Sequence, residues 1–172
     1  PPLISKATTT TCNIGALIRI TGQDLGSSQE SNNVSIGGAV AAIHAWQDTL
    51  IVCKVPQGLS AGSVNVIIER NNQQSNQLSI LLAGPKISSV NRGEQPSYGD
   101  TVVISGDLFG TSSSEGPGTV TINGTQRNTT FWSQTAIEVV WPILKTLSDA
   151  STVNVDVTIG GLTTTFVVVT GQ

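Results

Sequence analysis

The two cysteines are the side chains of this 172-residue chain that can most readily form a covalent bond. Cys12 and Cys53 are its only thiols. In an alternating apolar segment Cys53 shares a face with Ile51 and Val55, a pattern typical of a small buried residue. Cys12 precedes a predicted strand, where a bridge would tie the entry bend to the sheet, and a loop of roughly 40 residues contributes about 4 kcal/mol in the chain-entropy model. We expect a Cys12–Cys53 disulfide in an oxidising compartment, with two unrelated thiols as the alternative.

Three asparagines begin triplets of the type that accepts N-linked glycans, at Asn33, Asn123 and Asn128. All three are expected on loops or hairpins, where a glycan can be accommodated. A chain rich in Asn, Ser and Thr also produces such triplets by composition alone. Asn123 has a second interpretation, because Asn-Gly supplies the left-handed conformation of a tight hairpin.

No arrangement of residues predicts catalysis, a metal centre or a cofactor. His44 is the only histidine and has no second ligand near it in the sequence, which favours an ordinary strand residue. Asp24, Asp48 and Asp107 fall in predicted turns, where Asp commonly binds backbone groups, and they lack the spacing of a calcium loop. No Ser-His-Asp set, acidic pair or phosphate-binding Gly-rich loop stands out. We therefore predict that the chain is not an enzyme.

The three tryptophans have the chemistry of sugar-stacking platforms. Trp46 and Trp132 occupy equivalent positions of an internal repeat, which favours a structural role in the fold. Trp141 has no such twin, because Val55 stands at its position in the first repeat. We therefore expect Trp141 to be the exposed contact of the three.

The repeat organises the whole chain. Residues 15–26 (GALIRITGQDLG) return as residues 99–110 (GDTVVISGDLFG), each a strand between two Gly turns. The repeat predicts two domains of about 85 residues, 1–83 and 84–172. The linker Ala-Gly-Pro at 83–85 is short and stiffened by Pro, which favours a rod-like pair with limited relative freedom.

Period-two alternation predicts short strands throughout. Ile18 and Ile20 are expected in the core. The expected strands are residues 2–5, 17–21, 34–36, 40–45, 50–55, 64–69 and 78–82 in the first domain, and 86–90, 101–105, 119–122, 125–132, 136–140, 153–159 and 162–169 in the second. About seven short strands per domain predict an all-β chain of two tandem immunoglobulin-like antiparallel β-sandwiches, although the Cys…Trp…Cys pattern of immunoglobulins is absent.

The composition of the chain argues against nucleic acid as a partner and against a membrane-spanning segment. With 8 Lys and Arg, a net charge of −3 and a pI near 4.9, the chain offers no basic stripe for nucleic acid. No apolar run reaches the roughly 20 residues that span a bilayer. The chain starts at Pro1 and contains no Met, from which we expect a processed or excised piece of a larger protein.

Several short motifs follow one another in each repeat, with substitutions between the two copies. They are an opening Pro-x-Ile (Pro85 to Ile87), Gly-x-Asp-Leu-Gly (Gly22 to Gly26), VSIGG at residues 34–38, Trp-x-x-Thr-x-Ile (Trp46 to Ile51) and Val55-Pro56. In these motifs both halves resemble the IPT/TIG family, the immunoglobulin-like fold of plexins, Rel-type transcription factors and some bacterial carbohydrate enzymes.

The chain departs from that family in two places. Leu108 stands where the family favours Asn or Asp, so the side-chain bond that braces the turn is expected to be missing or replaced by backbone. The Cys that plexins usually carry after the first hairpin is also absent, which argues against a plexin-like ligand-binding role.

The resemblance implies a non-catalytic extracellular or cell-surface module that acts in adhesion, in protein–protein recognition or as a spacer or assembly unit. Its partner would be another protein or a second copy, bound through loops such as residues 23–33 and 111–118 or through apolar edge strands such as residues 165–170. The alternative is a carbohydrate-binding or spacer accessory to a secreted carbohydrate-active enzyme. Rel-type DNA binding would require a basic recognition loop, and the scattered Lys and Arg residues of this chain do not form one.

Overall fold

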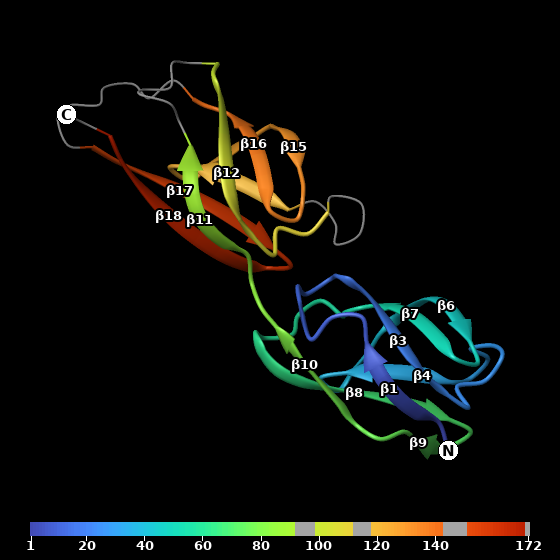
Figure 1. Ribbon diagram of the computed structural model, residues 1–172. Helices are drawn as coiled ribbons and strands as arrows, with labels where there is room; N and C mark the ends of the chain where they lie inside the picture. Colours follow the sequence, from blue (N-terminus) through green and yellow to red (C-terminus); the bar gives the residue numbers. More distant parts are fainter. Residues whose placement is uncertain (92–98, 112–117, 143–150, 171–172) are drawn as a thin grey trace. The chain divides into compact units, whose positions relative to one another are not determined.

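The computed structural model describes residues 1–91, 99–111, 118–142 and 151–170. Contacts divide the chain into two compact units, Pro1–Ala83 and Gly84–Gln172, called unit 1 and unit 2 below (Figure 1). All regular elements of the described residues are β-strands, which confirms the predicted all-β fold. Most of the predicted recognition loop 111–118 lies outside the described residues.

Unit 1 is a sandwich of two sheets (Figure 1). One sheet has the order β1-β3-β7-β6, and the other has the order β2-β10-β8-β4-β5 with β9 paired to β8. The strands are β1 (Leu3–Ala7), β2 (Thr11–Cys12), β3 (Leu17–Gln23), β4 (Asn33–Ile36), β5 (Ala39–Val40), β6 (Ala42–Gln47), β7 (Leu50–Lys54), β8 (Gly62–Arg70), β9 (Gln73–Gln74) and β10 (Leu78–Leu82).

Unit 2 repeats this plan with sheet orders β11-β12-β16-β15 and β14-β13-β17-β18. Its strands are β11 (Lys86–Asn91), β12 (Thr101–Asp107), β13 (Thr119–Ile122), β14 (Thr125–Arg127), β15 (Thr129–Trp132), β16 (Ala136–Val140), β17 (Ser151–Ile159) and β18 (Leu162–Thr170). The strand pairs are antiparallel except for β2 and β10, which run parallel.

Alternation along each strand builds the two cores. In β3, Ile18 and Ile20 are buried while Leu17 and Arg19 face outward, as the sequence predicted. In β12, Val102 and Ile104 are buried in the same way. The core of unit 2 combines inward residues of both sheets, mostly Val and Ile, with Phe109 and Trp141. β-Branched side chains suit this pleated, half-buried surface.

Four hairpins have two-residue turns with both residues in the left-handed region. The turns are Gly37-Gly38, Asn71-Asn72, Asn123-Gly124 and Gly160-Gly161, with φ between 48° and 85°. Such turns match the right-handed twist of the flanking strands and favour Asn and Gly. The hairpin predicted at Asn123-Gly124 is confirmed.

Two predicted strands are wrong in the same way. Residues 40–45 divide at Ala41 into β5 and β6, and residues 125–132 divide at Asn128 into β14 and β15. In each unit the first piece pairs in one sheet and the second in the other. Neither Gly nor Pro stands at the crossing point in either unit, so no turn residue marks the change of sheet. The short strand β2 was also predicted as a bend.

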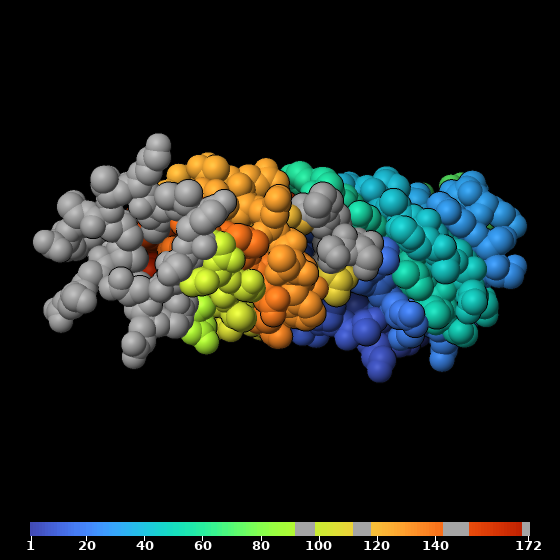
Figure 2. All heavy atoms as spheres, turned by 90° about the horizontal axis from the view of Figure 1, so that it is seen from above, coloured from blue at the N-terminus to red at the C-terminus, as the bar shows by residue number. Residues whose placement is uncertain are grey.

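The outward-facing side chains of the alternating strands form the outer sides of the sandwiches. In the space-filling view the teal atoms of β6 and β7 lie on the outside of unit 1 (Figure 2). Within the described ranges no helix is long and apolar enough to cross a membrane.

Candidate functional site

The repeated Gly-x-x-apolar-Gly turn is held in unit 1 by Trp46. Its indole Nε1–H donates to the carbonyl oxygen of Leu25 over 3.0 Å, with Leu25 fully buried. The turn backbone is bound to the next hairpin, because the amides of Gly22 and Leu25 donate to the carbonyls of Thr49 and Asp48 at 3.1 and 3.0 Å. This turn and its tryptophan, called the clasp below, is therefore a structural device.

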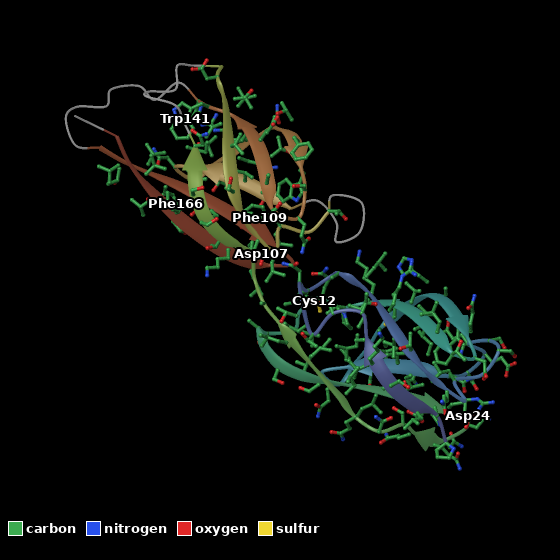
Figure 3. The ribbon with its side chains drawn as sticks, in the orientation of Figure 1. Cys12, Asp24, Asp107, Phe109, Trp141 and Phe166 are labelled. Carbon is green, nitrogen blue, oxygen red and sulfur yellow. The ribbon has the colours of Figure 1, made fainter. Side chains whose placement is uncertain are left out.

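Unit 2 contains the same clasp. Trp132 Nε1–H donates to the Phe109 carbonyl over 2.8 Å, and the amides of Gly106 and Phe109 donate to Thr135 and Gln134. The predicted structural role of Trp46 and Trp132 is confirmed by these bonds. Figure 3 shows Asp107 and Phe109 together at the end of unit 2 away from Trp141.

Leu108 sits in this second clasp with a left-handed backbone. Its φ is 57°, and the equivalent Asp24 has φ 54°. The amide of Leu108 donates to the Asp107 carboxylate at 2.9 Å, so a neighbouring side chain supplies the brace of this turn. An apolar residue with a Cβ is disfavoured in this conformation, whereas Asp and Asn are tolerated.

Replacing Leu108 should therefore separate backbone strain from side-chain packing. We expect Leu108→Gly to be more stable than Leu108→Ala by about 1 kcal/mol, because both lose the side chain and only Ala retains the strain. Leu108→Asn should also be more stable than Leu108→Ala, because Asn tolerates the left-handed conformation better than Ala does. Denaturant unfolding of unit 2 measures these differences, and equal stability of the Gly and Ala variants would contradict the assignment.

The prediction that Trp141 is an exposed contact is wrong. Trp141 is 3% exposed and belongs to the core of unit 2. It follows Ile137 and Val139 at two-residue spacing, so the strand alternation carries it to the buried face, as it does Val55 in unit 1. Its backbone also closes the sheet, since the Trp141 amide donates to the carbonyl of Asp100.

Both cysteines lie in the interior of unit 1. Cys12 and Cys53 are 4% and 0% exposed, and both are thiols in this structure. Burial, and after it the charge that Cys12 would carry, raises the pKa of Cys53 to about 12. The segments that follow the two cysteines are joined, because the Gly15 amide donates to the Val55 carbonyl at 3.1 Å. The disulfide itself stays a prediction.

The three glycan triplets have different surroundings. Asn33 is half-buried as the first residue of β4, so its predicted loop position is wrong. Asn123 has φ 48°, and its Oδ1 accepts from the Asn154 amide at 2.9 Å, which confirms the turn role. Asn128 is exposed between β14 and β15. Glycosylation of any of them stays a prediction.

The polar turn residues have structural partners. Asp48 accepts from the Gly26 amide with its carboxylate at 3.0 Å, inside the first clasp. His44 is exposed on β6. Within the described ranges no group of three His, Cys, Asp or Glu residues could hold a metal ion.

The predicted recognition loop 23–33 is tied down at both ends. Arg70 donates from Nη1 to the Asp24 carbonyl at 2.9 Å, and Asn32, 7% exposed, accepts from the Asn71 amide at 3.3 Å. This polar loop is therefore attached to the turn between β8 and β9. A loop held in one conformation loses little entropy when it binds a partner.

The edge strands differ in their capacity to accept another strand. A register shift interrupts each of the edge strands β1, β6, β11 and β15. Such bulges twist an edge away from further pairing. The edges β2, β5 and β9 are two residues long, and β14 has three.

In contrast, β18 is a long and regular edge. It pairs with β17 over nine consecutive positions without a shift, and its sequence LTTTFVVVT contains no charge. On its outer face Val167 and Val169 are 53% and 58% exposed. In the part of the chain that the structure describes, β18 is the last strand of its sheet, and β11, which pairs with β12 in the other sheet, lies close to it.

Hydrogen bonds from threonine hydroxyl groups stabilise the outer face of the sheet beside β18. The Asp156 carboxylate accepts from Thr165 at 2.6 Å and from Thr121 at 3.0 Å, which links β13, β17 and β18. Thr158 and Thr163 share a further hydrogen bond of 2.7 Å. β18 is therefore a fixed edge, which lowers the ordering cost of pairing with it.

Comparison with known proteins identifies the same domain family in both halves of the chain. The family model of the IPT/TIG domain matches twice, at residues 2–81 and 85–170. No curated protein sequence matches the chain.

Among solved structures, the full extracellular region of plexin A4 is similar, with a TM-score of 0.60 and 16% identity over 98% of this chain. This chain covers 18% of that plexin region. A second plexin A4 structure has a TM-score of 0.55 and 15% identity, and covers 100% of this chain and 16% of its own. SGBP-B from a complex xyloglucan utilization locus in Bacteroides uniformis has a TM-score of 0.42 and 16% identity, and covers 96% of this chain and 48% of its own.

Proposed function

Because both halves of this chain belong to the IPT/TIG family, a family of non-catalytic immunoglobulin-like modules, we propose that it is an extracellular or cell-surface module for recognition and assembly. Its two units supply the scaffold, and the free edge of β18 supplies the contact. The occupant of that edge is β18 of a second copy of the chain.

The character of β18 carries this proposal. An unbroken edge strand offers its backbone N–H and C=O groups to another strand, as in strand addition. Two antiparallel copies centred on Phe166 would place Val167 opposite Thr165. Cross-strand pairs of β-branched residues each contribute about 0.2–1 kcal/mol. The strand carries no charge, so two copies meet without repulsion.

Such an interface is small, which suits weak association reinforced by many copies at a surface or along a filament. An extracellular setting is supported by the fold shared with the plexin A4 extracellular region. The two buried cysteines, if they form a disulfide, and the exposed Asn128 triplet are compatible with the same setting.

Sedimentation velocity of the full chain over a wide concentration range tests the assignment. We expect the wild-type chain to self-associate and Val167→Lys to remain monomeric, because a charge facing its own copy opposes pairing. Val40→Lys is the matched control, since Val40 is 69% exposed on the two-residue strand β5. A wild-type chain that stays monomeric at millimolar concentration, or a Val40→Lys variant equally weakened, would overturn the proposal.

The alternative role as a carbohydrate-binding accessory finds no aromatic platform in the part of the chain that the structure describes. Trp46 and Trp141 are buried, and Trp132 donates its indole N–H within the second clasp. Phe131 is 49% exposed. A single exposed ring does not make the row of platforms that sugar stacking uses, so β18 remains the better supported contact.

A further inference from the structure

The two thiols of unit 1 stand on opposite sheets of its sandwich. Cys53 lies in the centre of one sheet, where β7 is flanked by Ile18 of β3 and Ile43 of β6. Cys12 lies in β2, the short outer strand of the other sheet, and Figure 3 shows it at the end of unit 1 away from Asp24. A bond between them would join the sheets through the core.

Cys12 belongs to a short strand at the edge of its sheet. β2 has two residues, and its parallel pairing with β10 sets Cys12 beside Leu82. The Cys12 carbonyl accepts from the Ala83 amide at 3.0 Å. Parallel pairing is slightly less stable per residue than antiparallel pairing, so a covalent link at Cys12 would add to the stability of β2.

We propose that Cys12 and Cys53 form an inter-sheet disulfide that fixes β2 to the core, and that unit 1 is thereby the redox-dependent half of the molecule. In this reaction the two thiols lose two electrons and two protons and form one S–S bond. The oxidant is an exchangeable disulfide such as oxidised glutathione, which accepts them and leaves as two thiols.

Unit 2 provides an internal reference. Val139 occupies the position of Cys53, is equally buried, and unit 2 contains no cysteine. Unit 1 can therefore form an internal disulfide, whereas unit 2 has the same fold and cannot. A change of redox state should act on unit 1 and leave unit 2 unaltered.

Burial also determines when the bond forms. The thiolate is the species that attacks a disulfide, and the raised pKa of Cys53 makes it scarce in folded unit 1 at neutral pH. Oxidation therefore takes place before the sheets close or during local opening. Once formed, the bond is shielded from reductants by the same packing.

Refolding of the full chain with reduced and oxidised glutathione tests the proposal. We expect intact mass to fall by two hydrogen atoms per chain and peptide mapping to identify a Cys12–Cys53 link. Reduction should lower the unfolding temperature of unit 1 by about 20 °C. Hydrogen exchange, read by mass spectrometry for peptides of each unit, should accelerate in unit 1 only.

Cys53→Val is the matched control, because it installs the residue that unit 2 uses and abolishes the bond. Its exchange should be independent of redox conditions. Retention of both thiols after oxidative refolding, a link between different chains, or a redox effect of equal size in unit 2 would each overturn the proposal. Alkylation of the folded, reduced chain should be slow and should accelerate in denaturant, whereas rapid native alkylation of Cys53 would contradict the closed geometry.

Discussion

Replacing Gly22 or Gly106 by alanine should destabilise the unit that carries it by about 3 kcal/mol or more. A Cβ at Gly22 would overlap the carbonyl oxygen of Leu3, and one at Gly106 would overlap that of Lys86. These are backbone atoms of the paired strands β1 and β11, so no side chain can move aside. Relief requires the first strand of the unit to separate from its sheet.

Gly38→Ala and Gly124→Ala are the controls for this result. Both positions have positive φ, at 85° and 76°, and no atom lies within 4 Å of an added Cβ. Each of these two substitutions should lower the free energy of unfolding by about 1 kcal/mol, because alanine is disfavoured in the left-handed backbone conformation. Denaturant unfolding gives the free energies, and hydrogen exchange assigns each loss to its unit. Losses no larger than those of the controls would mean that β1 and β11 can shift without cost.

Removing the clasp tryptophans should have the second large effect. Trp46→Ala is expected to lower the free energy of unfolding of unit 1 by about 3–5 kcal/mol, because it deletes a large side chain that is 9% exposed. Trp46→Phe keeps most of the apolar volume but leaves the buried Leu25 carbonyl without its donor, which costs about 1–3 kcal/mol. Trp132→Phe should reproduce this effect in unit 2 through Phe109.

The Phe variants contain the decisive comparison. If the indole hydrogen bond stabilises the turn, exchange of the amides of Gly22 and Leu25 should accelerate in Trp46→Phe more than exchange in the centre of β3. A Phe variant as stable as wild type would show that the indole N–H contributes nothing, and that the tryptophan acts through packing alone.

Both predictions concern residues that the repeat singled out. Gly22 and Gly106 recur because their strands pass too close to the first strand of each unit for a Cβ. Trp46 and Trp132 recur because each caps the carbonyl that the turn leaves unpaired. What the two copies share is scaffold, and the chemistry that differs between them is at Cys12, Cys53 and β18.

Local periodicity was sufficient for most of the strands. β10, β13 and β16 begin and end where alternation and turn residues predicted. The burial of Trp141 could also have been predicted, because it continues the spacing of Ile137 and Val139. The absence of a repeat partner was the wrong signal there, since parity in a strand, not similarity between copies, decides which face a side chain occupies.

By itself, the sequence determined the all-β class, the two-fold repeat, the family and the hairpin turns. These depend on interactions between near neighbours, such as left-handed φ angles at Asn-Gly and alternation within one strand. Only the tertiary structure decided where β5 gives way to β6 and that β18 is the long edge without a bulge. Each of these features depends on contacts between segments that are distant in the chain. The local sequence pattern does not predict which strands become neighbours.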